Sequence, residues 1–507
     1  MRSSTSFSEA DEVAGGADIK PDHASRHSAD RQEDFEVLEH AGRAALRYRS
    51  AIAAGASHVP RSYQELRTAG DSGTPEQGVS AARAIEQLIA FAEPGLLATT
   101  GPNFFGWVVG ASHPLGVAAD WLTSAWGQNC GNPQTAPAAA VAEEVAARWL
   151  LDILRLAPDA TVGFVSGTTM ASFACLAAAR SHVLLAAGWD VEAKGLFGAP
   201  PIQVLVSEEA HTSVFLALRM LGLGQERVHR IRTDGNGAML ADHFHMLLRD
   251  CAGPTIVIAQ AGHISTGAFD PVAAMLPALR RHGAWLHIDG AFGLWARACP
   301  ELAPLTAGIE AADSWATDGH KWLQVPYETG YAIVAHGDAH RRALAASASY
   351  LAPVGDEVRD PTQYVPELSR RARGFPTWAM LRHLGRDGVA AMVARHCRLA
   401  RKIAARLAAE PAVSVLNEVV LNQVIVRFGT DRSPEAGDAM TQETIGVIQS
   451  RGQCFVSGAR WKDRWVMRVS VISWPTRDHD AETAAAQILD AWRQVSGKAA
   501  ASGKIRA

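Results

Sequence analysis

The sequence predicts an α/β protein with a large domain on a mostly parallel central sheet, followed by a smaller α+β domain. Between residues 161 and 334, short apolar runs typical of strands alternate with helical patterns of roughly ten to fifteen residues, as in βαβ units. Beyond residue 374, helical stretches come before several short strands, which favours an α+β domain. A chain of 507 residues has room for two or three domains.

The composition is that of an ordinary soluble protein. Hydrophobic residues make up 48% of the chain and charged residues 20%, and the net charge of −4 offers no basic footprint for nucleic acid. No window approaches the roughly 18 apolar residues of a membrane span, and the polar amino terminus lacks a signal-peptide core. We therefore expect a cytoplasmic protein that binds neither nucleic acid nor membrane.

The cysteines indicate a reducing compartment. Six of them lie far apart without a CxxC pair, which argues against a disulfide framework and against a metal site. They are Cys130, Cys175, Cys251, Cys299, Cys397 and Cys454.

Five divisions are predicted along the chain. Residues 1–34 are polar and mixed in charge, and we expect a disordered tail there. Residues 35–110 form a helical segment whose amphipathic helices, over 35–56 and 81–91, pack on their own domain or cover a subunit interface. The other divisions are the large domain, the small domain and a loose tail: 111–346, 347–496 and 497–507. The small domain opens with an irregular, Pro-rich and charged stretch, 347–374, which we expect to be a mobile loop.

A turn of small residues follows the first predicted strand of the large domain. The strand covers 161–165, and the turn, 166–172, leads into a helix. Free backbone N–H groups at the amino end of a helix form a geometry that binds phosphate. The turn is neither a GxxxxGK[ST] loop nor a GxGxxG, so a nucleotide is not indicated, and many such turns merely cap the helix. In the helix that precedes the strand, we expect Glu143 and Glu144 to be exposed.

Polar side chains stand at the carboxyl ends of the predicted strands. Thr168 follows the first strand, and His211, His263 and Asp289 follow later ones. In open parallel sheets, ligands bind beyond the carboxyl ends of the strands. The sequence therefore predicts a ligand site that these residues share, although His211 alone is typical of a surface histidine and Asp289 alone of a turn or helix cap.

The stretch 313–322 is small, polar and turn-prone, and it contains His320-Lys321 just before an apolar run. A lysine in a cleft loses its proton more easily and attacks carbonyl groups, although most lysines are merely solvated. Together, a phosphate turn, a histidine, an aspartate and a lysine fit pyridoxal 5′-phosphate. Lys321 would form the Schiff base, and Asp289 would keep the pyridine nitrogen protonated, which makes the ring an electron sink.

The remaining cofactor contacts follow from the same assignment. His211 would stack on the face of the ring. The phosphate would be held by three side chains: Thr168, Thr169 and His320.

At this point the sequence resembles the pyridoxal-phosphate-dependent group II amino-acid decarboxylases, the family of aromatic-L-amino-acid, histidine and glutamate decarboxylases. The resemblance covers about residues 35–495. It is carried by four stretches: Asp313-Ser314 with Asp318-Gly319-His320-Lys321-Trp322, Leu286-His287-Ile288-Asp289-Gly290-Ala291, Glu209-Ala210-His211-Thr212-Ser213, and residues 166–180.

The resemblance implies a fold-type-I homodimer with active sites at the subunit interface, where residues 35–110 would pack on the partner. It also implies α-decarboxylation of an L-amino acid to an amine and CO₂. Family members use a tyrosine on a mobile loop as the proton donor, and those with phenylalanine there tend toward oxidative aldehyde formation. His263, Ala291 and Asp318 would lie beside the cofactor.

Several positions depart from the family. Asp318 and Gly319 stand where Asn and Pro are common, and a carboxylate near a phosphate is repulsive unless it is hydrogen-bonded or turned away. His263 stands where Thr or Asn is common. The 347–374 loop is too short to place the proton donor by motif, so Tyr364 is our candidate, with Tyr350 behind it.

The aromatic stretch 103–107 resembles the family's substrate-pocket wall, although it also fits a buried turn. Its wall residues are Asn103, Phe104, Phe105 and Trp107. An aromatic wall suits an aromatic or apolar substrate side chain, and the absence of an arginine from this stretch disfavours glutamate. Alternatives are another enzyme with this cofactor (an aldehyde synthase, another lyase or an aminotransferase) and a non-catalytic relative.

Overall fold

The computed structural model describes residues 23–55, 59–71, 73–345 and 358–504. It divides into two compact units. The first comprises the described parts of Met1–Ala51 and Pro60–Leu97, and the second those of Ile52–Val59 and Ala98–Ala507. The sheets and the predicted site residues from Asn103 onward all belong to the second unit.

The first unit is helical, as predicted for 35–110. Its elements are α1 (His23–Ala53, shared at its end with the second unit), α2 (Tyr63–Gly70), α3 (Ala81–Ala92) and η1 (Glu93–Gly95). A capping box starts α2, because Ser62 and Glu65 each bond the other's backbone N–H. Phe35, Leu38 and Leu46 of α1 are exposed, so this unit carries apolar surface that its own chain leaves uncovered.

Both predicted tails are partly wrong. The helix α1 begins at His23, so residues 23–34 are helical, and residues 1–22 lie outside the described residues. At the other end, α14 (Asp478–Lys504) continues through most of the predicted tail 497–507. In both places, polar composition concealed a helix that extends an apolar, well-formed one.

The large domain is built on a seven-stranded sheet of order β1-β7-β6-β5-β4-β2-β3. Only β7 is antiparallel to its neighbours, so the predicted mostly parallel sheet is confirmed. Its strands are β1 (Thr161–Val165), β2 (Gln203–Ser207), β3 (His229–Ile231), β4 (Thr255–Gln260), β5 (Trp285–Asp289), β6 (Ser314–Asp318) and β7 (Gly330–Val334).

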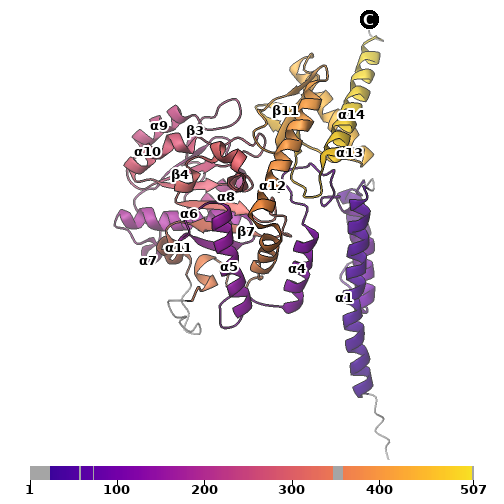
Figure 1. Cartoon of the computed structure of the whole chain (residues 1–507), viewed down its shortest axis with the longest axis horizontal. Helices are drawn as coiled ribbons and strands as arrows, with labels where there is room; N and C mark the ends of the chain where they lie inside the picture. Colours follow the sequence, from indigo (N-terminus) through magenta and orange to yellow (C-terminus); the bar gives the residue numbers. More distant parts are fainter. Residues whose placement is uncertain (1–22, 56–58, 72, 346–357, 505–507) are drawn as a thin grey trace, which may run out of the picture. The chain divides into compact units, whose positions relative to one another are not determined.

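Helices cover both faces of this sheet (Figure 1). Within β4, Ile256 and Ile258 pack with α6 in one core, while Val257 and Ala259 belong to the core on the opposite face. The helices of this domain are α4 (Pro114–Trp126), α5 (Pro137–Ile153), α6 (Thr168–Ala186), α7 (Val191–Lys194), α8 (Thr212–Met220), α9 (Ala241–Asp250), α10 (Val272–His282) and α11 (Gly337–Leu344). Short 3-10 turns are η2 (Gly293–Ala298), η3 (Pro300–Thr306), η4 (Ile309–Ala311) and η5 (Pro361–Tyr364).

In the described part of the chain, α6 alone is long and apolar enough to be considered for a membrane span. Its apolar window is 61% buried, and the helix packs on β5, β6 and β7 and against α8 and α11. This is the environment of an internal helix of a globular domain.

The small domain pairs a four-stranded antiparallel sheet, of order β10-β11-β9-β8, with helices. Its strands are β8 (Val413–Val415), β9 (Gln423–Phe428), β10 (Ser457–Trp461) and β11 (Arg464–Ser470), and its helices are α13 (Pro434–Arg451) and α14. The long α12 (Gly374–Ala408) runs from the large domain into this one (Figure 1), and its helical backbone is interrupted at Gly385.

Glu143, predicted to be exposed, is fully buried in α5. Its carboxylate bonds the guanidinium of Arg370 at 2.9 Å and lies 3.4 Å from Arg359. Burial opposes ionisation of Glu143, but the guanidinium of Arg370 outweighs it and holds the pKa of Glu143 below its usual value. The two arginines come from the predicted mobile loop, so this ion pair ties the described part of that loop to α5.

Candidate active site

Several predicted site residues lie at neighbouring strand ends of the seven-stranded sheet. The end of β6 at Asp318 pairs with Gly330, the first residue of β7, and Gly330 in turn pairs with Val165 at the end of β1. A side chain at Gly330 would stand 2.5 Å from the Cα atom of Gly167. Because Gly330 has no side chain, the turn after β1 packs against the start of β7, next to the end of β6.

Lys321 stands just beyond β6. Its Nζ atom lies 3.0 Å from Oδ2 of Asp318, and its side chain is 18% exposed. Gln324 Nε2 donates to the Lys321 carbonyl at 2.9 Å. A Cβ atom on Gly110 would overlap that same carbonyl, so the backbone around Gly110 closes over Lys321. The lysine therefore has a fixed backbone and a side chain that opens to the site.

Asp318 links the lysine to the phosphate turn. Its Oδ1 atom accepts the Thr168 N–H at 2.7 Å, and its Oδ2 atom lies 3.6 Å from Nε2 of His320. His320 accepts the Thr329 N–H at Nδ1, and its ring lies 4.3 Å from that of Tyr327. Burial lowers the pKa of His320, and the Asp318 carboxylate opposes that shift without reversing it. His320 is thus neutral near pH 7, with its Nε2–H facing Asp318.

Asp289 ends β5, the strand beside β6. It is 5% exposed, and its Oδ1 accepts the Ala291 N–H at 3.3 Å. Burial raises the pKa of Asp289, while the charges of His211 and Lys321 pull it down. Ala291 joins the two strand ends, because its carbonyl accepts the backbone N–H of Asp318 at 2.9 Å.

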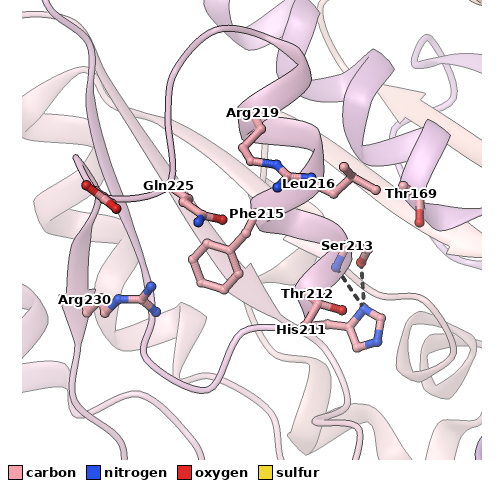
Figure 2. Close-up of a pocket in the computed structure, with 10 residues that line it drawn as sticks. Thr169, His211, Thr212, Ser213, Phe215, Leu216, Arg219, Gln225 and Arg230 are labelled. Atoms are coloured by element: carbon pink, nitrogen blue, oxygen red, sulfur yellow. Dashed lines mark hydrogen bonds between the residues drawn. The ribbon is translucent and has the colours of Figure 1, made fainter.

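His211 caps α8 at the same edge. Its Nδ1 accepts the backbone N–H of Ser213 at 3.3 Å and lies 2.7 Å from the Ser213 hydroxyl, as Figure 2 shows. Burial lowers the pKa of His211, and the Asp289 carboxylate partly opposes this. The charges of Asp289 and Lys321 both act on the pKa of His211, so the three groups lie within electrostatic reach of one another.

A pocket of about 750 Å³ continues from His211 along α8. Thr169 and His211 lie at one end of the residues drawn in Figure 2, and Arg230 lies at the other. The guanidinium of Arg230 stands 4.7 Å over the ring of Phe215. The predicted phosphate residue Thr169 thus lines a pocket that also contains His211.

His263, predicted to lie beside the cofactor, contacts Glu209 and its own turn, and its role toward the cofactor stays a prediction. Its Nε2 lies 3.2 Å from Oε2 of Glu209, and its Nδ1 accepts the Ser265 N–H at 3.3 Å. Both ring nitrogens are therefore engaged inside the protein. His263 holds Glu209, two residues before His211, so it supports the loop that carries the predicted stacking histidine.

Tyr364, our candidate proton donor, is not at this edge. Its ring packs on His340 at 5.4 Å, its carbonyl covers Gly163, and it is 7% exposed. His340 lies 2.8 Å from the Thr161 hydroxyl at the start of β1, the end of the strand opposite Thr168. Tyr364 therefore lies away from Lys321 within its own chain. Its role as the proton donor stays a prediction, and Tyr350 lies outside the described residues.

The predicted pocket wall is partly a core element. Phe105 is fully buried in the core of the small domain, so it does not line a pocket. Phe104 stacks on Phe455 at 4.9 Å, and Trp107, half exposed, lies 5.5 Å from the same ring. Asn103 pairs its carbonyl with the Phe455 N–H at 3.0 Å, which fixes this aromatic cluster.

Sequence reasoning missed residues that reach the site from the small domain. Trp461 of β10 donates to Glu209 at 3.0 Å. Arg468 of β11 is buried, donates to the Ile264 carbonyl, and lowers the pKa of His211. A signal existed for Arg468, because it interrupts the apolar strand Val466-Met467-Arg468-Val469, and a buried charge of this kind is rare without a partner.

The donor set fits pyridoxal phosphate. The Thr168 hydroxyl, at the amino end of α6, is buried and has no partner among the described residues. Gly167 beside it leaves room that a side chain would fill, 3.2 Å from the His320 ring. Asp289 and Lys321 supply the carboxylate and the amine that the cofactor's ring nitrogen and aldehyde require. No group of three His, Cys, Asp or Glu side chains suited to a metal occurs in the described ranges.

Comparison with known proteins agrees with this donor set. Residues 64–428 match the pyridoxal-dependent decarboxylase conserved domain. The aromatic-L-amino-acid decarboxylase of Rattus norvegicus is 28% identical over 419 residues, which cover 79% of this chain and 84% of the relative. The 4-hydroxyphenylacetaldehyde synthase of Rhodiola rosea is 24% identical over 380 residues, covering 72% of this chain and 76% of the relative.

Solved structures share the fold. Oryza sativa TDC, solved with PLP and tryptamine, aligns with a TM-score of 0.83 at 21% identity over 95% of this chain and 99% of the other. Mouse CSAD aligns with a TM-score of 0.81 at 20% identity over 93% and 99%. The fold is thus the fold type I of pyridoxal-phosphate enzymes. Because the family match spans well over half of its length, this chain belongs to the pyridoxal-dependent decarboxylase family as a pyridoxal-phosphate-dependent carboxy-lyase.

Proposed function

We propose that the enzyme decarboxylates an L-amino acid with an aromatic or apolar side chain to the corresponding amine and CO₂, with Lys321 as the covalent anchor of the cofactor. The observation that carries the proposal is the position of Lys321, whose Nζ emerges at the sheet edge 3.0 Å from Asp318 and electrostatically close to Asp289. A lysine so placed is held by a neighbouring carboxylate and is largely shielded from bulk water.

The surrounding residues have separable roles. When bound, pyridoxal phosphate supplies an electron sink for the negative charge left at Cα as CO₂ departs. Asp289 holds a proton at the ring nitrogen, and its burial strengthens that interaction. His211 lies against the cofactor ring, and its neutral form avoids adding positive charge there. The Thr168 hydroxyl, which has no partner among the described residues, would bind the phosphate, and His320 would lie beside it.

An aromatic or apolar substrate is supported by the cluster of Phe104, Trp107 and Phe455. Ring faces of this kind accept flat or branched apolar groups. Among the relatives, the rat enzyme and tyrosine decarboxylase 2 of Arabidopsis thaliana are named for aromatic substrates, which favours the same class.

A second candidate is oxidative aldehyde formation. It is favoured by the position of Tyr364, because among the described residues this candidate donor packs on His340 and not beside Lys321. An aldehyde synthase is also among the relatives. The two outcomes differ in stoichiometry, because aldehyde formation consumes O₂ and releases ammonia and peroxide, whereas decarboxylation alone yields CO₂ and amine.

We further propose a homodimer with shared sites in the cytoplasm. An apolar groove of about 480 Å³ lies between α4, α5 and α12. It is lined by exposed Leu122, Trp126, Val141 and Trp378. An exposed apolar surface of this kind suits a self-complementary contact with a second copy. The six buried, unpaired cysteines suit a reducing compartment.

The decisive experiment is a screen of the purified holoenzyme against the common L-amino acids. CO₂, amine, aldehyde and O₂ consumption are measured together. Amine and CO₂ in equal amounts from aromatic or branched apolar substrates are expected. Turnover of glutamate alone would refute the substrate class, and aldehyde with matching O₂ uptake would establish the second candidate.

A further inference from the structure

We propose that Asp318 weakens the contribution of the cofactor's phosphate group to binding, so that this enzyme discriminates poorly between pyridoxal phosphate and pyridoxal. The carboxylate of Asp318 and a phosphate compete for the same amino end of α6. This inference concerns cofactor affinity and does not depend on the substrate or the reaction outcome proposed above.

The carboxylate occupies the anion-binding position itself. The backbone N–H of Thr168 is the first of α6, and it points at Oδ1 of Asp318 over 2.7 Å. A helix amino end attracts anions through such N–H groups and through its dipole. The carboxylate of Asp318 therefore already accepts a backbone N–H that would otherwise be free to bind a phosphate.

Asp318 cannot swing its carboxylate far away. It is 2% exposed and lies within β6, where its backbone pairs with Gly330. Its N–H donates to the Ala291 carbonyl at 2.9 Å, and its own carbonyl accepts the Trp295 indole N–H at 3.0 Å. A backbone fixed on both sides keeps the carboxylate within a few ångströms of any phosphate on Thr168.

The nearby cations do not remove the conflict. Lys321, 3.0 Å from Oδ2, is the one full positive charge in contact with Asp318. His320, at 3.6 Å, is neutral near pH 7 because burial lowers its pKa. Lys321 would also be the amine that bonds the cofactor aldehyde, so its nitrogen would be held at the ring and not at the phosphate. Asp289, the other acid that faces Asp318, adds negative charge.

Asparagine at this position removes the charge while keeping the geometry. Its amide oxygen accepts the Thr168 N–H as the carboxylate does, and its amide nitrogen is a donor toward a phosphate oxygen. Relatives commonly have asparagine here. The change Asp318→Asn therefore tests the charge alone, with little demand on folding.

The experiment measures dissociation constants of pyridoxal phosphate and of pyridoxal for the full-length apoenzyme by titrating the visible absorbance of the bound cofactor. We expect Asp318→Asn to raise the affinity ratio of the phosphorylated over the unphosphorylated form by at least about tenfold, the size of effect that a neighbouring like charge produces. Asp338→Asn, which removes an equal charge from the exposed surface of α11, is the matched control and leaves the ratio unchanged.

Two results overturn the proposal. In the first, Asp318→Asn raises the affinity for both cofactor forms equally, which would mean that Asp318 acts through Lys321 and not on the phosphate. In the second, Asp318→Asn weakens the binding of pyridoxal phosphate, which would mean that the carboxylate favours phosphate binding. A second measurement uses the unmodified enzyme, so that a folding defect in the variant cannot affect it. We expect millimolar inorganic phosphate not to compete with pyridoxal phosphate for binding to this enzyme, and strong competition would overturn the proposal.

Discussion

Glu209 accepts the indole N–H of Trp461 at 3.0 Å and at the same time lies 3.2 Å from the imidazole of His263. Glu209 precedes His211 by two residues, whereas Trp461 ends β10 of the small domain. Burial opposes ionisation of Glu209, but the donors from His263 and Trp461 outweigh it and lower its pKa to about 2. One carboxylate thus joins the two domains directly behind the predicted stacking histidine.

We expect Trp461→Phe to destabilise the protein by roughly 1 kcal/mol, because the partly buried Glu209 carboxylate loses a donor. Urea unfolding of Trp461→Phe, Glu209→Gln and the double variant measures the coupling.

The pKa of Glu209 lies below its unfolded value, so its stabilising effect is full above pH ~4.3 and is lost as the pH falls toward 2. Glu209→Gln should therefore flatten the acid side of the stability profile, and an unchanged profile contradicts this.

Lys321→Ala should abolish the visible absorbance of covalently bound cofactor and all turnover, because the chain loses its anchoring amine. Spectra of the variant with added pyridoxal phosphate make the test. Lys194→Ala, which removes an exposed lysine beside Trp189, serves as the control and keeps the spectrum of the unmodified enzyme. A Lys321→Ala spectrum identical to that of the parent would refute the anchor.

Asp289→Asn should lower kcat on the order of a hundredfold, since a neutral amide no longer holds a proton at the ring nitrogen. Cofactor content, measured after gel filtration, should stay close to that of the parent, because the phosphate and Lys321 contacts persist. Turnover that survives the substitution would show that another group faces the ring nitrogen.

Tyr364→Phe should leave the ratio of amine to aldehyde unchanged, because the Tyr364 ring packs on His340 at the far end of β1. Product analysis of the variant with the best substrate of the screen tests this. A shift from amine toward aldehyde would mean that Tyr364 reaches a site outside its own chain. Tyr350→Phe is the informative comparison, and its role stays a prediction.

Glu143→Gln should cost about 3–5 kcal/mol, the range for breaking a buried ion pair, because Arg370 is left without its carboxylate. Glu144→Gln is a matched control one residue away, where an exposed pair with Arg148 contributes less than about 1 kcal/mol. Thermal and urea unfolding of both variants give the comparison. Equal losses would mean that the buried pair contributes little to stability.

The alternation of strands and helices and the order of polar residues at the strand ends were sufficient to predict the fold class and the cofactor. The family was predicted from the resemblance of four short stretches, 166–180, 209–213, 286–291 and 313–322. The sequence did not reveal that the polar stretch before Lys321 is the buried strand β6. Its Ser314 hydroxyl lies 2.9 Å from the Trp285 indole nitrogen and from the His287 ring, partners on the neighbouring strand β5. Polar residues whose hydrogen bonds are made to a neighbouring strand have the same composition as a turn, so they cannot be told from a turn before the strand pairing is known.

Other features that the sequence did not reveal have related causes. Glu143 lies on a helix face that looks solvated, and only the fold reveals Arg370, 227 positions away, as its partner. Tyr364 was selected because it lies in a loop-like segment, but 3-10 turn η5 and the packing against β1 fix it on the far side of the sheet. Long-range partners of this kind leave no periodic trace in the sequence.

The contact between Gly330 and Gly167 limits how this site can evolve. Neither glycine has a φ in the left-handed region, since Gly167 is extended with a φ of 169°. Each backbone conformation is therefore open to other residues, and the restriction is one of volume. A library that randomises both positions and is selected for activity should return glycine at 330, because no partner substitution removes the Gly167 backbone. A Cβ atom at position 167 would meet only the side chains of His320 and Asp318. Recombination with a homologous gene that exchanges β7 without the turn after β1 would create the same steric conflict. These two segments must therefore be inherited together.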